Sequence, residues 1–291
     1  MRPVAGVIPA VHTLEGAGFG VFRPLPAPGL DLLSPFLLID EMEPVDHPPG
    51  LAQGAPDHPH RGFETVTYLL EGEMEHRDSM GNHGLIGPGG IQWMTAGDGV
   101  VHSEMPSRRI QTEGGRAHGF QIWVDLPLAD KRTTPRYQSL DAHQLTTAEG
   151  DGWNARVVAG ELFGVRGPAE THTPIGYAHV TLRPGARVEV PLPADHNAAI
   201  YAFAGSGTAG APSTALPERH LAVFERSEGD LVLAAPPDAD HPLEALVLTG
   251  KPLDQPVARY GPFVMTTRAE LLEAVEDYQA GRMGTIAAVG V

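Results

Sequence analysis

The chain has 291 residues, a formal net charge of −16 and no cysteine. This length suffices for two domains of ordinary size, and 42% hydrophobic residues are enough for packed cores. The lack of cysteine excludes disulfides, iron–sulfur clusters and thiolate ligands, while the negative charge disfavours direct binding to nucleic acid. The N-terminal residues do not resemble a signal peptide and no segment approaches the length of a membrane span, so we expect a cytoplasmic protein without membrane contact.

Glycine and proline are frequent throughout the chain, with 35 and 28 residues. Such a distribution is typical of many short strands joined by turns. We therefore expect an all-β fold.

The first informative segment contains His58 and His60 in a stretch that is typical of a strand. Side chains in a strand alternate between its two faces, so these imidazoles share one face and aim at one point. If the strand continues unbroken, Glu64, Val66 and Tyr68 lie on that same face.

The second segment, about forty residues later, carries His102 and Glu104. The same alternation places this imidazole and this carboxylate on one face of their strand. Imidazole and carboxylate together suit iron, zinc, nickel, copper or manganese, whereas calcium requires oxygen ligands throughout. A set made of His58, His60, His102 and Glu104 leaves open positions on an octahedral ion, as a catalytic centre requires.

Several polar residues flank these ligand candidates. We expect Arg61 to form a structural salt bridge and Gly62 to leave space beside the metal. Gln92 or Glu64 is expected to accept a hydrogen bond from a metal-bound imidazole. Trp93 is expected in the core.

The chain continues with a strand over 120–125 and a polar stretch at 130–135, where we place a domain boundary. The predicted domains are a metal-binding domain, residues 1–133, and a second domain, residues 134–291. Near the end, Thr267 and Glu270 form a capping box, and a stripe of Leu271, Leu272, Val275 and Tyr278 predicts a helix that packs on the barrel.

Two stretches of the chain repeat each other, because Tyr68 and Gly72 have the same spacing as Tyr201 and Gly205. Residues 89–94 are similarly matched to residues 229–234. Two β-barrel copies explain this repeat better than one large sheet. In this alignment prolines occupy three ligand positions of the second copy: Pro191, Pro193 and Pro242 stand in the places of His58, His60 and His102. We therefore expect no metal in the second domain.

The run of residues 57–68, together with residues 92–97, His102-Ser-Glu104 and residues 261–265, resembles the signature of the pirin family, a branch of the cupin superfamily. The resemblance implies two cupin barrels, with the metal, usually iron(II), held at the positions of His58, His60, His102 and Glu104. Zinc, nickel, copper and manganese stay possible. It also implies that Glu104, rather than Glu64, is the carboxylate ligand.

Some pirins resemble quercetinases, which implies a dioxygenase that cleaves flavonol-like aromatics with O2. Glu104 is then the expected catalytic base for the substrate hydroxyl, and Glu64 is the alternative candidate for this base. The alternative is a regulatory protein whose metal state controls binding to a transcription factor or a metabolic enzyme.

Overall fold

A computed structural model describes residues 1–287, which form two compact units. The first unit combines His12–Val21, Leu38–Ala142 and the described residues from 254 to 287, and the second combines Met1–Val11, Phe22–Leu37 and His143–Leu253. The units are therefore not contiguous in sequence, in contrast to the predicted domains 1–133 and 134–291. The difference arises because the C-terminal segment pairs with strands of the first unit, which sequence proximity does not reveal.

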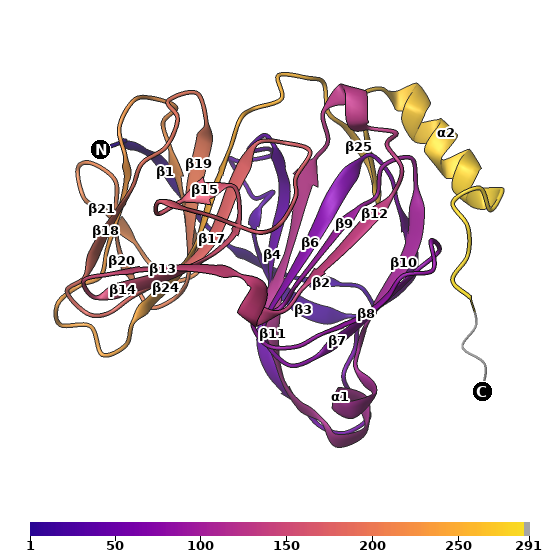
Figure 1. Ribbon diagram of the computed structural model, residues 1–291, viewed down its shortest axis with the longest axis horizontal. Helices are drawn as coiled ribbons and strands as arrows, with labels where there is room; N and C mark the ends of the chain where they lie inside the picture. Colours follow the sequence, from indigo (N-terminus) through magenta and orange to yellow (C-terminus); the bar gives the residue numbers. More distant parts are fainter. Residues whose placement is uncertain (288–291) are drawn as a thin grey trace. The chain divides into compact units, whose positions relative to one another are not determined.

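The first unit is built from two sheets (Figure 1). The seven-stranded sheet has the order β12 (Arg136–Leu140), β9 (Ile91–Thr95), β6 (Phe63–Glu71), β11 (Gly115–Asp125), β4 (Phe36–His47), β3 (Phe19–Leu25) and β2 (Val11–Glu15). The four-stranded sheet has the order β5 (Ala55–His60), β10 (Val100–Pro106), β7 (Met74–Asp78) and β8 (His83–Ile86). A hairpin of β25 (Ala258–Tyr260) and β26 (Phe263–Met265) completes its strands.

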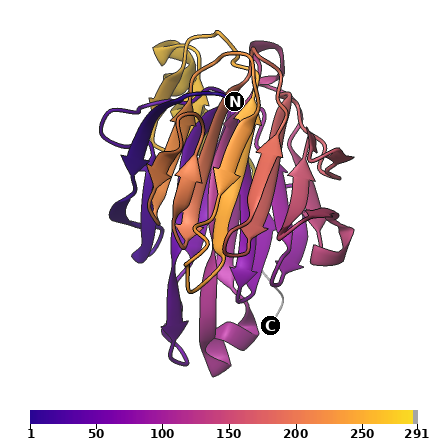
Figure 2. The ribbon, with the colours of Figure 1, turned by 90° about the vertical axis from the view of Figure 1, so that its left-hand side faces the viewer.

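The second unit repeats this plan, and its strands lie side by side in Figure 2. Its seven-stranded sheet has the order β1 (Val4–Pro9), β22 (His220–Phe224), β19 (Asn197–Ala204), β24 (Leu243–Gly250), β17 (Ile175–Leu182), β14 (Trp153–Ala159) and β13 (Thr146–Gly150). Its four-stranded sheet has the order β18 (Arg187–Val190), β23 (Leu231–Ala234), β20 (Gly207–Ala209) and β21 (Thr214–Leu216). The short strands β15 (Glu161–Leu162) and β16 (Val165–Arg166) pair with each other. The two-barrel, all-β prediction is confirmed.

The first half of the sequence repeat is reproduced by the strands. β6 and β19 each lie third in their sheets, and Gly72 and Gly205, which follow them, have positive φ. The second half of the repeat was aligned incorrectly. Residues 231–234 form β23 in the four-stranded sheet, so their counterpart is β10, whereas the counterpart of β9 is β22.

The corrected strand equivalence changes the residues that stand at the ligand positions of the second unit. His102 pairs with His58 in the first unit, and Leu233 pairs with Val188 in the second. Aligning the ends of β5 and β18 places Val190 at the position of His60 and Val188 at that of His58. Valines and a leucine, not the predicted prolines, therefore replace the three imidazoles. All three apolar side chains are buried in the core of that unit.

Two α-helices occur in residues 1–287: α1 (Arg108–Glu113) and α2 (Arg268–Gln279). Single 3₁₀ turns lie at Leu128–Asp130 and Ala142–Gln144. Neither α-helix is long and apolar enough to cross a membrane. The Ser107 hydroxyl caps α1 by accepting a hydrogen bond from the Ile110 N–H at 3.2 Å.

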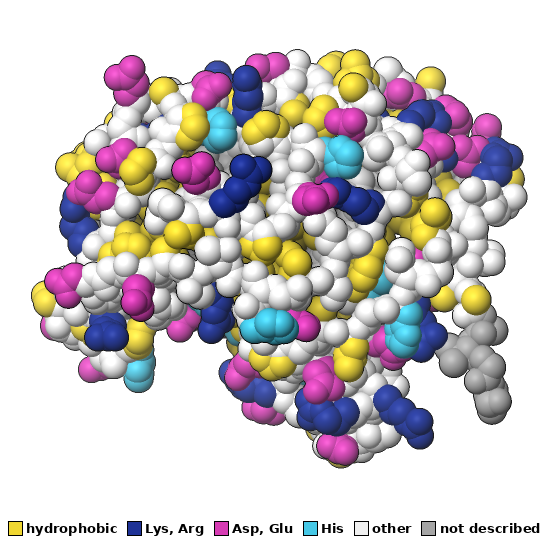
Figure 3. Space-filling model, in the orientation of Figure 1, with side chains coloured by type: hydrophobic (Ala, Val, Ile, Leu, Met, Phe, Trp, Pro, Cys, Tyr) yellow, Lys and Arg dark blue, Asp and Glu magenta, His cyan; other side chains and the backbone are white. Residues whose placement is uncertain are grey.

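Basic side chains gather over the end of the first unit that carries α1, interspersed with acidic ones (Figure 3). Arg109 is paired with Glu73 at 3.0 Å, and Arg116 with Glu71 at 2.7 Å and with Asp46 at 3.1 Å. These ion pairs are exposed and contribute little to stability. Their carboxylates offset the positive charge of the two arginines.

Helix α2 begins with the predicted capping box, in which Thr267 and Glu270 exchange side-chain and backbone hydrogen bonds. Its buried face differs from the predicted stripe. Leu271 and Ala274 are buried against β26, whereas Leu272 and Tyr278 are exposed. The barrel thus covers a narrower face of the helix than the apolar residues suggest.

Replacing Thr267 with alanine is expected to lower the free energy of unfolding by about 1 kcal/mol, because the N-cap acceptor of α2 is lost. Chemical denaturation measures this change, with Thr134→Ala at an exposed site as the control. Equal stabilities of the two variants would contradict a role of the cap.

Candidate metal centre

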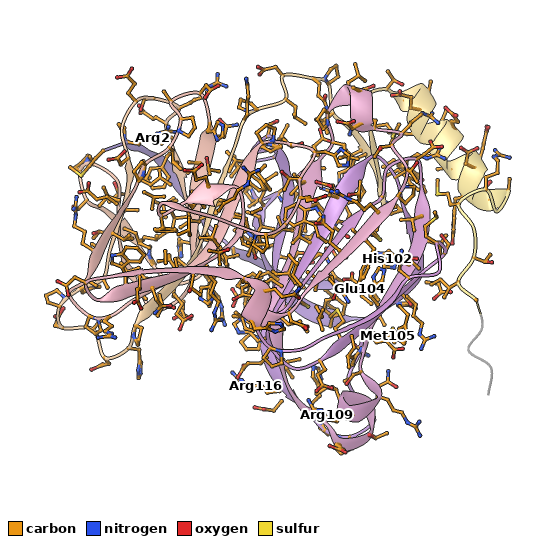
Figure 4. The ribbon with its side chains drawn as sticks, viewed as in Figure 1. Arg2, His102, Glu104, Met105, Arg109 and Arg116 are labelled. Carbon is orange, nitrogen blue, oxygen red and sulfur yellow. The ribbon has the colours of Figure 1, made fainter. Side chains whose placement is uncertain are left out.

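Three histidines of the first unit meet where β5 and β10 pair. His58 and His60 lie at the end of β5, and His102, which Figure 4 labels on β10, pairs with His58. One nitrogen of each ring lies within 4.8 Å of the other two. The H-x-H spacing thus places His58 and His60 on one face of β5, as the alternation of side chains in a strand predicts. The pairing of β5 with β10 adds the third ring.

The other ring nitrogen of each histidine faces a second partner. His58 Nδ1 donates to the carbonyl of Pro56 at 2.7 Å, and His60 Nδ1 donates to the carbonyl of Pro262 at 3.2 Å. His102 Nδ1 lies 3.5 Å from the Nδ1 of His76. Because a carbonyl only accepts, the first two rings carry their proton on Nδ1 and present an unprotonated Nε2.

These Nε2 atoms fit a divalent transition metal. Those of His58 and His60 are 3.1 Å apart, and two nitrogens at about 2.1 Å from one ion at a right angle would be about 3 Å apart. The Nε2 of His102 is buried without a hydrogen-bond partner. A buried polar atom without a partner is costly, and a metal ion would satisfy it.

Burial and the neighbouring rings also favour the neutral form of two of the imidazoles, His60 and His102. Burial, followed by the nearby histidines, lowers the pKa of His60 and of His102 well below the ordinary value. Unprotonated imidazole is the form that binds a metal.

Glu104 lies two residues beyond His102 on β10 (Figure 4), and both of its oxygens accept hydrogen bonds. Thr67 donates to Oε1, and Gln121 Nε2 donates to Oε2 at 3.0 Å. Gln121 also donates to the Thr67 hydroxyl at 3.1 Å. Glu104 is not one of the three side chains within 4.8 Å of one another. Its place as a fourth ligand stays a prediction.

The strand with the first two histidines does not continue unbroken, contrary to the sequence prediction. β5 ends at His60, and β6 begins at Phe63 in the other sheet. As a result Thr67 faces Glu104, and Glu64, on the opposite face of β6, accepts a hydrogen bond from Thr95 at 2.7 Å.

The change of face also affects Val66 and Tyr68, which were predicted to share the face of the two histidines. Val66 and Tyr68 share the face of Glu64, and both are fully buried in the core. They therefore do not line the ligand cluster as expected. The break at the end of β5 shifts the alternation, so the predicted and observed faces are exchanged.

Gly62 makes this break possible, with φ at +87°. A Cβ here would lie 1.9 Å from the carbonyl oxygen of Val264, so glycine leaves space for β26 rather than for the metal. The neighbouring Arg61 is buried and forms the predicted salt bridge, with Nη2 2.7 Å from Asp277 on α2. Lys131 holds the same junction through the carbonyls of Gly62 and Val264.

The sequence prediction for Gln92 was wrong, because the groups beside the three Nδ1 atoms are Pro56, Pro262 and His76. Gln92 instead neighbours Tyr137, on the adjacent strand. Burial raises the pKa of Tyr137 to about 12, against the opposing effects of Ser139 and Gln92. Trp93 is fully buried, as predicted.

The sequence gives partial signals for the missed contacts. Pro262 belongs to the motif at residues 261–265, but nothing local links it to a histidine 202 positions away. His76 and Asp78 have the same alternating spacing as the ligand pairs. Their orientation depends on the pairing of β7 with β10, which the spacing does not specify.

Two β-barrels of matching strand order, one of which carries a cluster of three imidazoles, define a two-domain cupin protein. Residues 18–124 match the Pirin family model, and residues 177–284 match the model of the Pirin C-terminal cupin domain. The chain belongs to the pirin family.

Individual relatives agree with this assignment. A pirin-like protein of Solanum lycopersicum is 42% identical over 271 residues, which are 93% of this chain and 89% of the relative. The crystal structure of quercetin 2,3-dioxygenase from Acinetobacter baumannii is 35% identical, with a TM-score of 0.90 over 99% of this chain and 100% of the other. The nickel(II) complex of the pirin YhhW from Escherichia coli shares the fold at 22% identity, with a TM-score of 0.64 over 85% of this chain and 99% of the other.

Proposed function

We propose that the protein is a metal-dependent dioxygenase of the quercetinase type that acts on flavonol-like aromatics with O2. The proposed ligands are His58, His60, His102 and Glu104, and the proposed metal is iron(II). The observation that carries the proposal is the convergence of three imidazoles whose ligating nitrogens lie within 4.8 Å of one another. The similarity to the quercetin 2,3-dioxygenase of Acinetobacter baumannii supports it over the whole chain.

The metal, when bound, would act as a Lewis acid and would have open coordination positions for a substrate oxygen and for dioxygen. The protein supplies the base. Glu104 accepts the proton of the substrate hydroxyl, since its carboxylate lies on the same face of β10 as His102. Thr67 and Gln121 hold the two oxygens of this carboxylate in place.

An aromatic wall adjoins the histidines on one side. Trp123 is partly exposed, and its ring lies 5.3 Å from the ring of His60. The guanidinium of Arg259 lies over Trp123, with Cζ 4.7 Å from the ring centroid. This combination favours a flat aromatic substrate that becomes an anion on losing its hydroxyl proton.

The iron-loaded protein, supplied with quercetin under air, is expected to consume oxygen and release carbon monoxide. The His58→Ala variant is the matched control, because it removes one ligand at the edge of the centre. Oxygen uptake by both proteins at the same low rate would contradict the proposal.

That outcome would favour the regulatory alternative, in which the metal state controls binding to a protein partner. Pull-downs with the iron(II) and iron(III) forms would then test for partners that differ between the two states. Metal analysis of protein purified without an affinity tag distinguishes iron from zinc, nickel, copper and manganese.

A further inference from the structure

The three imidazoles differ in the groups beside their Nδ1 atoms. His58 and His60 donate to backbone carbonyls, which cannot change their role. His102 instead faces the side chain of His76, with 3.5 Å between the two Nδ1 atoms. An imidazole can donate or accept, so the contacts of His76 decide which nitrogen of His102 is left for the metal.

His76 is held in one orientation by two further contacts. It is buried on β7, and its ring stacks on Tyr137 with 4.5 Å between centroids and 20° between planes. Its Nε2 lies 3.2 Å from Oδ2 of the buried Asp78. The ring is therefore fixed between a metal-ligand candidate and a carboxylate.

Asp78 is itself anchored by the turn that follows β7. Its Oδ1 accepts from the backbone N–H groups of Met80 and Asn82, both at 2.9 Å, and its Oδ2 accepts from Asn82 Nδ2 at 2.8 Å. All three donors are N–H groups, so both oxygens of Asp78 act as acceptors. The group is thus an ionised carboxylate that only accepts.

The positions of the protons on the two imidazoles follow from the carboxylate of Asp78. His76 donates from Nε2 to Asp78, so in a neutral ring its Nδ1 is an acceptor. His102 must then donate from Nδ1, which leaves its Nε2 unprotonated toward the metal. We propose that His76 and Asp78 are positioning residues that fix the tautomer of His102 through a carboxylate–imidazole–imidazole chain.

The hydrogen-bonded series of Asp78, His76 and His102 makes His102 different from the other two proposed ligands. Its Nδ1–H is linked to a negative charge, whereas those of His58 and His60 end on neutral carbonyls. An anionic partner beyond a ligating imidazole increases the basicity of that ligand. The inference rests on the proposed metal centre, but binding and tautomers are measured without turnover, so its failure differs from a failure of the dioxygenase proposal.

The direct test is nitrogen-15 NMR of histidine-labelled protein loaded with zinc(II) as a diamagnetic probe. Two-bond proton–nitrogen couplings are expected to show the proton of His76 on Nε2 and the proton of His102 on Nδ1. A proton on Nδ1 of His76, in either the neutral or the doubly protonated ring, would overturn the proposal.

A matched set of variants adds a second measurement. His76→Phe keeps a ring against Tyr137 but removes the acceptor, so zinc affinity is expected to fall about 10–100-fold. His76→Gln restores an acceptor and is expected to recover part of the loss. His83→Phe, on the neighbouring strand at an exposed site, is the control. Unchanged affinity of His76→Phe, or an equal loss in the control, would contradict the proposal. The NMR test of the unaltered protein applies even if a variant fails to fold.

Discussion

Replacing His60 with alanine is expected to lower iron(II) affinity by more than about 100-fold, because the loss of a partner beyond a ligand already costs 10–100-fold. His60 is buried, and its Nε2 lies 3.1 Å from that of His58, so no exposed side chain can take its place without rearrangement. Anaerobic metal titration measures the affinity.

A thermal shift gives a second measurement for the same variant. A metal that binds only the folded state raises its stability in proportion to the logarithm of metal concentration over Kd. Iron(II) is therefore expected to raise the melting temperature of the unaltered protein and of His83→Ala, but not of His60→Ala. A variant that retains the full shift would show that His60 is not a ligand.

Replacing Gly62 with alanine is expected to lower the free energy of unfolding by about 3 kcal/mol or more. The added Cβ would lie 1.9 Å from the Val264 carbonyl oxygen and 2.8 Å from the sulfur of Met265, at a positive φ that alanine disfavours. The strand β26 must then move, and the acceptor of His60 on Pro262 moves with it. We expect faster hydrogen exchange in residues 258–265 and weaker metal binding.

Gly81 provides a closely matched control for this substitution. Its φ of +88° equals that of Gly62 within a degree, but a Cβ there meets nothing within 4 Å. Gly81→Ala is thus expected to cost only the conformational term, about 1 kcal/mol. Equal destabilisation by the two substitutions would contradict the account of how β26 packs on the end of β5.

The sequence predicts the local parts of the centre well. One residue separates His58 from His60, and a strand places such a pair on one face whatever surrounds it. The capping box of α2 is similarly local, since Thr267 and Glu270 lie within one turn. The repeat of Tyr68 and Tyr201 identified two barrels because each lies in a central strand of its sheet.

Features that depend on sheet pairing were not predictable in the same way. The break at Gly62 exchanges the faces of β6, so a one-residue change in register reversed the predicted neighbours of Glu64 and Thr67. The positions of Val188 and Leu233 opposite each other likewise follow only from the pairing of β18 with β23.

The contact between His60 and Pro262 was also not predictable from the sequence, because it depends on long-range packing. It joins segments 202 residues apart, and it requires the chain to return to the first unit after the second barrel is complete. Nothing in residues 254–265 specifies such a return.

X-ray absorption spectroscopy of the protein loaded with one equivalent of iron(II) tests the central claim most directly. The account predicts three imidazole ligands in the multiple-scattering pattern, with light oxygen donors in the other positions. The pattern is expected to lose one imidazole in each of His58→Ala, His60→Ala and His102→Ala. A spectrum with fewer than three imidazoles, or one that none of these substitutions alters, would contradict it.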